Sequence, residues 1–306
     1  MRQRVIAVVG ATAAGKTELS LRLARELDGE VINADSMQLY RGMDVGTGKL
    51  AAGERGGVPH HLLDIWDVTE PASASEYQRL ARAAIAEIGA RGRTPILVGG
   101  SGLYIRAAID NLEFPGTDPA VRERLERELA TVGHGVMHAR LARADPAAAV
   151  VILPGNGRRI VRALEVIELS GRPFTATLPD YTSVLPTTQI GLAVPRAELD
   201  RRIAARVSRM WQDGLVDEVK RLAAAGLRDG RTASRALGYA QVLRHLDGDW
   251  TQAQAQDETV RATRRFARRQ ESWFRRDPRI RWLPAAGPVP TEQALAAITE
   301  SGLVAD

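Results

Sequence analysis

The stretch RVIAVVGATAAGKTELS, residues 4–20, joins a short apolar run to a helical pattern through a glycine-flanked loop. Residues 10–17 of it, GATAAGKT, satisfy the pattern G-x-x-x-x-G-K-[ST], and they lie between an expected strand and an expected helix, the context that gives this pattern its meaning. Backbone N–H groups in such a loop, together with the N-terminus of the helix that follows, favour a bound anion. The stretch therefore predicts a phosphate-binding site in an α/β domain.

The candidate phosphate-binding residues are those of the loop itself. Lys16 would add a point charge, and the hydroxyl of Thr17 could bind Mg²⁺. The alternative is a glycine-rich turn that matches the pattern by chance, which the strand and helix on either side disfavour. The predicted set is Gly10, Ala11, Thr12, Ala13, Ala14, Gly15, Lys16 and Thr17.

Composition is that of a globular protein, with 306 residues, 44% hydrophobic and 26% charged. The chain has no cysteine, which excludes disulfides, thiolate metal sites and a cysteine nucleophile. We find neither a credible signal peptide nor an apolar run near the ~20 residues that span a bilayer, and we expect a cytoplasmic protein that does not bind membranes.

The order of apolar runs and helical patterns predicts an α/β fold with a parallel sheet. Strands are expected at 5–9, 30–35, 61–65, 94–100 and 187–194, with a helix of about twenty residues from Ser73. Residues 116–187 read mainly as charged helices and predict a helical insertion. The first part of the core would then be 1–115 and the second part 188–306, and the chain after Arg196 is expected to be almost wholly helical.

Asp35 is the acidic residue that follows a predicted strand. Many phosphate-loop proteins place an aspartate after another buried strand, but there this chain has the sequence GGSG, residues 99–102. Because ligands bind at the carboxyl ends of strands in open α/β sheets, Asp35 should face the same crevice as the loop. It could also serve only as a helix or turn cap, or as a Mg²⁺ ligand.

Basic residues are concentrated near the C-terminus. Three of the 42 basic residues are lysines, so 39 are arginines, and residues 261–281 hold nine of these against about three expected from the average. Phe266, Gln270, Trp273 and Phe274 could form one apolar stripe of a helix. The segment contains little acid, which favours a nucleic-acid backbone as partner over a merely solvated face.

Other candidates are weaker. His60 and His61 are neighbours on a predicted strand and would point to opposite faces, so we interpret them as structural rather than as a metal pair. Trp211 and Trp250 are interpreted as packing residues.

Several segments together resemble the bacterial tRNA dimethylallyltransferases, in order and over nearly the whole chain. They are GATAAGKT, NADSMQLYRGMDVGTGK, VPHHLLDI, PILVGGSGLYIRAAIDNL, GRRIVRALEVIELSGRPF and RRFARRQESWFRRDPRIRW. The resemblance implies an enzyme that transfers a dimethylallyl group from dimethylallyl diphosphate to N6 of the adenosine 3′ to the anticodon, position 37 of tRNA. The phosphate loop would then bind the diphosphate of this donor, with Mg²⁺ as cofactor.

The resemblance also implies roles for individual residues. Asp35 would be the catalytic base, with Lys16 and Thr17 also catalytic, and Arg235 would lie near the diphosphate. The insertion would bind the anticodon stem-loop, and we expect a monomer. The implied tRNA contacts are Asp35, Ser36, Met37, Gln38, Ser101 and Arg122, to which the arginine-rich segment would add Arg265, Arg268 and Arg269.

Four positions depart from the family pattern. Ala11 and Ala14 replace Pro and Ser, Ser101 replaces Thr but keeps the hydroxyl, and Ala240 stands where a basic residue is expected. Three alternatives stay open on the residues alone: a small-molecule kinase, an adenylate isopentenyltransferase and a non-catalytic RNA-binding protein. The first two would leave the arginine-rich segment unexplained, and the third would not need Lys16, Thr17 and Asp35 together.

Overall fold

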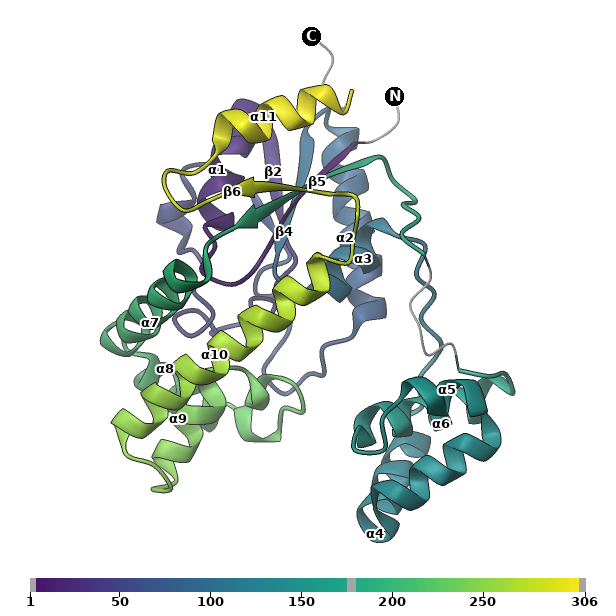
Figure 1. The fold of residues 1–306 in the computed structure, drawn as a ribbon. Coiled ribbons are helices and arrows are strands. Elements are labelled where there is room, and N and C mark those ends of the chain that lie inside the picture. Colours follow the sequence, from purple (N-terminus) through teal and green to yellow (C-terminus); the bar gives the residue numbers. More distant parts are fainter. Residues whose placement is uncertain (1–3, 175–179, 303–306) are drawn as a thin grey trace. The chain divides into compact units, whose positions relative to one another are not determined.

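The computed structural model describes residues 4–174 and 180–302. The chain divides into two compact units, one formed by Met1–Asp110 with Ser183–Asp306 and the other by Asn111–Thr182. The first unit contains a parallel sheet of six strands in the order β3-β2-β4-β1-β5-β6 (Figure 1). Its strands are β1 (Val5–Val9), β2 (Gly29–Asn33), β3 (His60–His61), β4 (Thr94–Gly99), β5 (Thr187–Ala193) and β6 (Ile280–Pro284). The predicted α/β class is confirmed.

Helices cover both faces of this sheet. One face packs against α1 and α11, and the other packs against α2, which in turn contacts α3. The remaining helices of the unit follow β5 and form a helical region in which α10 packs against α7 and α9 (Figure 1). The bounds are α1 (Lys16–Glu26), α2 (Ala74–Ala90), α3 (Gly102–Ile109), α7 (Arg196–Gln212), α8 (Leu215–Ala224), α9 (Tyr239–Leu246), α10 (Gln252–Phe274) and α11 (Thr291–Glu300), with short 3₁₀ turns η1 (Ala52–Arg55), η2 (Leu227–Asp229) and η3 (Ala233–Arg235).

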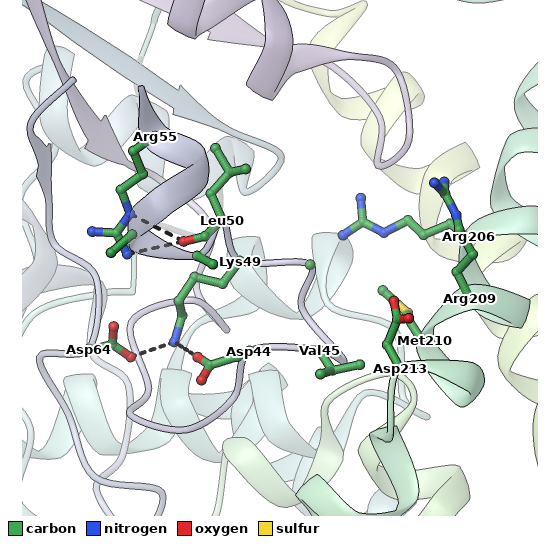
Figure 2. A pocket seen from close by; sticks show the side chains of 13 residues that line it. Asp44, Val45, Lys49, Leu50, Arg55, Asp64, Arg206, Arg209, Met210 and Asp213 are labelled. Carbon is green, nitrogen blue, oxygen red and sulfur yellow. Dashed lines mark hydrogen bonds and ion pairs between the residues drawn. The ribbon is translucent and has the colours of Figure 1, made fainter. Parts of the chain in front are cut away.

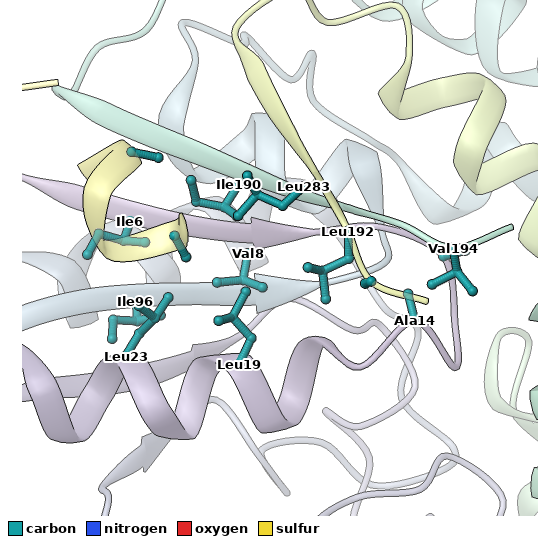
Figure 3. Packing of buried hydrophobic residues seen from close by; sticks show 14 of the residues in the cluster. Ile6, Val8, Ala14, Leu19, Leu23, Ile96, Ile190, Leu192, Val194 and Leu283 are labelled. Carbon is teal, nitrogen blue, oxygen red and sulfur yellow. The ribbon is translucent and has the colours of Figure 1, made fainter. Parts of the chain in front are cut away.

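The main hydrophobic core lies between the sheet and α1. Alternate residues of a strand point to one face, so Ile6 and Val8 of β1 face the same way and meet Leu19 and Leu23 of α1 (Figure 3). All four are at most 2% exposed. Ala14 of the phosphate loop belongs to the same cluster. The core therefore fixes the loop from below, at the carboxyl end of β1.

Two strand predictions are wrong. The expected strand at 61–65 is reduced to the two residues of β3, because Leu62 and Asp64 adopt positive φ angles of 59° and 56°, which end an extended strand. Conversely, β6 lies in the region expected to be helical. It pairs with β5 at the edge of the sheet, with Ile280 opposite Gln189. This partner is distant in sequence, so local propensity gives little sign of the strand.

The second unit is helical and has its own core. It consists of α4 (Pro119–Ala144), α5 (Pro146–Val151) and α6 (Gly157–Ser170), packed around buried apolar side chains such as Leu125, Leu141 and Ile160. Helix α4 is broken at Gly133, where φ is 80° and ψ is 168°. The unit begins and ends about five residues before the predicted insertion 116–187, and Thr187 already lies in β5.

Candidate active site

The phosphate loop connects β1 to α1 in a tight backbone conformation. Gly15, directly before α1, has a φ of 99°, a region that glycine adopts readily, and Ala13 also has a positive φ of 63°. Lys16 is the first residue of α1, and its Nζ donates a hydrogen bond to the carbonyl oxygen of Ala11 at 2.7 Å. The loop residues predicted from the sequence are thus brought together at the N-terminus of a helix of 11 residues.

Lys16 lies in an environment that disfavours its charge. Burial lowers the pKa of Lys16 to about 8, an effect opposed by the negative charge of Asp35 and reinforced by the positive charge of Arg206. The side chain is therefore poised to gain from a bound anion, because a diphosphate would replace the solvation that the ammonium group has lost.

Asp35 follows β2 and is held by a short turn. Its N–H donates to Oδ1 of Asn33 at 2.9 Å, and its own Oδ1 accepts from the N–H of Met37 at 3.0 Å. Asn33 also donates through Nδ2 to the carbonyl of Leu62 at 3.0 Å. Within the described residues, Oδ2 of Asp35 has no hydrogen-bond partner. One oxygen thus caps the turn, as one alternative predicted, while the other can take part in chemistry.

Ser36 contacts the loop after β4. The N–H of Ser36 donates to Oγ of Ser101 at 3.3 Å, and the two hydroxyl oxygens are 3.5 Å apart. Because β1, β2 and β4 are parallel, their carboxyl ends lie at one edge of the sheet, with β4 between the other two. This shared edge explains why the residues after β2 and β4 meet.

A cavity of about 320 Å³ lies beside this edge. We call it the main cavity, because many of the predicted residues line it. Thr12 comes from the phosphate loop, Asp35 from the end of β2, and Arg269 from α10. The lining residues are Thr12, Asp35, Ser36, Met37, Gly46, Thr47, Ile203, Arg206, Val207, Met210, Thr232, Arg235, Ala236, Leu237, Thr259, Thr263, Phe266 and Arg269. A phosphate loop, a carboxylate and three arginines around a partly apolar cavity suit a ligand with an anionic head and a hydrocarbon tail.

The other predicted residues do not line this cavity. Lys16 is turned to the backbone of its own loop. Thr17 and Gln38 line a smaller recess of about 40 Å³. Arg265 and Arg268 are exposed on α10, and Ser101 reaches the site through its contact with Ser36.

Two of these residues could hold a divalent cation. Thr17, an exposed residue at the start of α1, offers its hydroxyl, and Asp35 offers its carboxylate at the same edge of the sheet. The described residues contain no group of three or more His, Asp or Glu side chains able to hold a metal on their own. This pair still fits Mg²⁺, which is commonly held by one or two side chains together with the phosphates of a substrate.

Arg206 of α7 is a site residue that no motif in the sequence predicts. It lines the main cavity, donates through Nη2 to the carbonyl of Thr47 at 2.7 Å, and interacts electrostatically with both Lys16 and Asp35. Burial lowers the pKa of Arg206, and the charge of Asp35 opposes this effect. Arg206 lies beside Ile203 and Val207, which are both on the buried face of α7. This position in the sequence could have identified Arg206, but a chain with so many arginines gives little reason to single out one of them.

A second cavity of about 480 Å³ lies next to the first and shares Arg206 and Met210 with it. Figure 2 shows Lys49 between two carboxylates, with Nζ 2.6 Å from an oxygen of Asp44 and 2.6 Å from one of Asp64. Arg206 and Arg209 enter from α7 on the other side (Figure 2). Lys49 thus holds together the segments that contain Asp44 and Asp64.

Glu218 fixes the backbone of residues 44–46, which leads to the main cavity. It is 2% exposed, and its carboxylate accepts hydrogen bonds from the N–H groups of Asp44, Val45 and Gly46 at 2.8–3.1 Å. The hydroxyl of Tyr239 also donates to Glu218, at 2.5 Å. Burial raises the pKa of Tyr239, so the hydroxyl keeps the proton that it donates.

The arginine-rich segment is only partly available for a partner, and the expectation of little compensating acid is wrong for five of its arginines. Nε of Arg264 lies 3.8 Å from an oxygen of Asp200. Arg261 and Arg265 both pair with Glu258, at 2.9 and 2.5 Å. Arg279 lies beyond α10 and pairs with Asp110 and Asp277, whereas Arg281 pairs with Glu300. Arg268 forms no ion pair within the described residues, and the guanidinium of Arg269 lies 5.7 Å from the ring centre of Phe266.

Arg122 lies in the helical unit, in α4. Its Nη2 is 2.6 Å from Oε2 of Glu165, whose carboxylate is fully buried. Glu165 also accepts from Thr117 at 2.6 Å and pairs with Arg162 at 2.9 Å. The side chain of Arg122 is one-third exposed, so this ion pair orients it and still leaves part of it accessible.

The two histidines have structural partners. Nδ1 of His60 is 2.8 Å from the carbonyl of Val58, and Nε2 of His61 is 2.6 Å from Oε2 of Glu30. Trp211 is buried, and the guanidinium of Arg244 lies 4.6 Å from the ring centre of Trp250, in line with the packing roles predicted. No described helix is long and apolar enough to cross a membrane.

The sheet, the loop after β1 and the carboxylate after β2 define a protein of the P-loop NTPase-like fold class, with a helical unit inserted between β4 and β5. The model of one family, IPP transferase, matches residues 38–277. The chain belongs to this family.

Relatives with high identity extend the match beyond that range. The tRNA dimethylallyltransferase of Streptomyces avermitilis is 70% identical over 94% of this chain and 93% of its own length, and that of Thermobifida fusca is 65% identical over 97% and 94%. The crystal structure of the full-length tRNA isopentenylpyrophosphate transferase from Bacillus halodurans is 40% identical, with a TM-score of 0.73 over 98% of each chain. A eukaryotic dimethylallyltransferase structure described as acting on tRNA is 26% identical, with a TM-score of 0.83 over 98% of this chain and 79% of that one.

Proposed function

We propose that this chain transfers a dimethylallyl group from dimethylallyl diphosphate to N6 of the adenosine 3′ to the anticodon of tRNA, releasing diphosphate. The observation that carries the proposal is the main cavity, which places the phosphate loop, Asp35 and Arg269 around one space of about 320 Å³. Relatives that are 65–70% identical and named tRNA dimethylallyltransferase support the same reaction.

The donor binds with its diphosphate on the phosphate loop. The carbon–oxygen bond to the diphosphate breaks as the allylic carbon gains positive character, and negative charge accumulates on the leaving group. Loop N–H groups, Lys16 and Arg206 stabilise that charge because they are fixed before the reaction begins. Arg235, on the wall of the same cavity, supplies a further cation near the diphosphate. When bound, Mg²⁺ would be held by Thr17 and would add electrostatic stabilisation of the diphosphate. Asp35 as a second ligand is the alternative to its role as a base.

Asp35 acts on the acceptor. The lone pair of the adenine amine is delocalised into the ring, so a base must remove a proton as the nitrogen attacks the allylic carbon. Oδ2 of Asp35 takes this proton, while Oδ1 keeps its bond to the N–H of Met37. The new bond joins N6 to the allylic carbon, and the electron pair of the broken bond leaves with the diphosphate.

The adenine reaches the cavity only after it leaves the stack of the anticodon loop. Ser36 and Met37 line the cavity beside Asp35 and are placed to contact the flipped base, with Ser101 behind Ser36 and Gln38 next along the turn. The arginines of α10 and the helical unit, through Arg122, bind the RNA backbone. We expect the enzyme to act in the cytoplasm and as a monomer. Size-exclusion chromatography with light scattering measures the oligomeric state.

The test is a direct assay. The protein is incubated with dimethylallyl diphosphate, Mg²⁺ and unmodified tRNA, and the digested nucleosides are analysed by mass spectrometry. We expect N6-dimethylallyladenosine from tRNA and none from AMP or ADP. Turnover of AMP or ADP in place of tRNA would instead identify an adenylate isopentenyltransferase, and ATP-dependent phosphorylation of a small molecule would identify a kinase.

A further inference from the structure

The side chain of Gln270 joins α10 to two loops of the active site. It is 6% exposed, and its Oε1 accepts a hydrogen bond from the N–H of Thr12 in the phosphate loop at 2.9 Å. Its Nε2 donates to the carbonyl of Gly100, in the loop after β4, also at 2.9 Å. Both polar groups of this buried amide are therefore used.

The fit around the amide is close. A Cβ at position 100 would lie 2.2 Å from Nε2 of Gln270, so only a glycine there allows the present approach. Three residues further along α10, Trp273 packs in the same way against Gly102, where a Cβ would lie 2.1 Å from the indole ring. Two neighbouring side chains of α10 thus pack closely against Gly100, in the loop after β4, and against Gly102, the first residue of α3.

The other side of α10 faces outward with positive charge. Arg268 and Arg269, directly before Gln270 in sequence, are exposed, and Arg269 lines the main cavity together with Phe266. One turn of α10 thus carries cations suited to an RNA backbone and, on its buried face, the amide that contacts the phosphate loop.

We propose that Gln270 is a positioning residue that couples RNA binding at α10 to diphosphate binding at the phosphate loop. RNA phosphates that bind Arg268 and Arg269 restrict the motion of α10, and Gln270 passes this restriction to Thr12. A loop that is already ordered loses less entropy when it binds diphosphate, so the two ligands bind cooperatively. The inference rests on the proposed function, because it takes tRNA as the ligand of α10.

The test measures the coupling itself. The affinity for inorganic diphosphate with Mg²⁺ is determined by calorimetry with and without a saturating anticodon stem-loop RNA. For the unsubstituted protein we expect the RNA to tighten diphosphate binding by about fivefold or more, as for typical coupled sites, and diphosphate to tighten RNA binding by the same factor. In Gln270→Met, which keeps the length of the side chain but loses both hydrogen bonds, the factor should fall to about one.

Two further variants separate coupling from general damage. Gly100→Ala displaces the amide without removing it and should also abolish the coupling, which provides an independent result if Gln270→Met folds poorly. Gln252→Met, at the exposed first residue of α10, should keep the full factor. Unchanged coupling in folded Gln270→Met or Gly100→Ala, or no coupling in the unsubstituted protein, would overturn the inference. Failure of the proposed function would appear separately, as the absence of prenylated tRNA in the direct assay.

Discussion

Lys16 and Asp35 are the residues in which burial and charge act most directly on the chemistry. The pKa of Lys16 is set by two opposing effects, burial that lowers it and the carboxylate of Asp35 that raises it, and burial prevails. A pKa of about 8 leaves Lys16 mostly protonated at neutral pH and mostly neutral above pH 9. A bound diphosphate favours the protonated form and must raise this pKa.

Diphosphate binding should therefore weaken as the pH rises through about 8, the pKa of Lys16 in the free protein. Near pH 9, binding should also take up a proton, because the bound anion recharges the lysine. Calorimetry in buffers with different ionisation enthalpies measures this uptake. Lys16→Ala should bind inorganic diphosphate about 10- to 100-fold more weakly at pH 7, the value of a hydrogen bond to a charged group.

Substitution by arginine provides the control for Lys16. Lys16→Arg keeps the charge at every pH in this range, so it should bind diphosphate without the proton uptake near pH 9. If Lys16→Ala and Lys16→Arg take up as much proton as the unsubstituted protein, then another group titrates and Lys16 does not contact the diphosphate.

Asp35→Asn separates the readings of Asp35. The amide oxygen can still accept from the N–H of Met37, so the turn should survive and tRNA binding should change little. It cannot take a proton from N6, so prenyl transfer should slow by about 10²-fold or more. Single-turnover rates with both substrates saturating measure this step.

A magnesium series decides between a base and a metal ligand. If Asp35 serves mainly to hold Mg²⁺, the defect of Asp35→Asn should appear in donor affinity and shrink as Mg²⁺ is raised. Full rescue by the metal would remove the role of general base, whereas a slow step that persists at saturating Mg²⁺ supports it.

At the scale of elements, the sequence identifies what depends on neighbours along the chain. The phosphate loop is recognisable because its strand, its glycines and its helix are contiguous. The helix after Ser73 is recognisable because serine is a favoured residue before the first turn of a helix, and Ser73 does accept a hydrogen bond from the N–H of Glu76. The edge strand β6 and the role of Gln270 could not be read in this way, because each depends on a partner more than 80 residues away.

The arginines of α10 should contribute unequally to RNA binding. Arg268 and Arg269 are free of ion pairs within the described residues, whereas Arg265 must first leave Glu258. Arg268→Gln and Arg269→Gln should each weaken tRNA binding and flatten its salt dependence by about 0.7–0.9 in the slope of log K against log salt, and Arg265→Gln by less. Arg228→Gln, on an exposed arginine paired with Asp247, is the control and should leave the slope unchanged. If all four variants have the same slope as the unsubstituted protein, then α10 is only a solvated helix.

At the scale of the whole molecule, the sequence predicts a helical insertion from a change in residue character, but not where the chain leaves the core. That point is set by contacts between distant residues. Asp110 forms an antiparallel bridge with Ser183, and Arg279, from the turn before β6, binds both Asp110 and the hydroxyl of Ser183. Three separate parts of the sequence thus meet where the second unit begins and ends.

These contacts predict that the first unit folds without the second. The N–H of Val184 donates to the carbonyl of Ile109 at 2.8 Å, so the chain ends left by removing Asn111–Thr182 lie side by side, and a Gly-Ser-Gly linker can join Asp110 to Ser183. Each unit has its own hydrophobic core, and the cavity with Thr12, Asp35 and Arg269 lies wholly in the first.

The shortened protein should keep cooperative thermal unfolding and bind inorganic diphosphate within about threefold of the full chain, a difference below ~1 kcal/mol. Its affinity for tRNA should fall at least tenfold, because the phosphate contacts of the helical unit are lost. Filter binding and calorimetry on both proteins provide the comparison: unchanged tRNA affinity would refute the RNA-binding role of the insertion, and loss of diphosphate binding in a folded protein would show that the donor site needs both units.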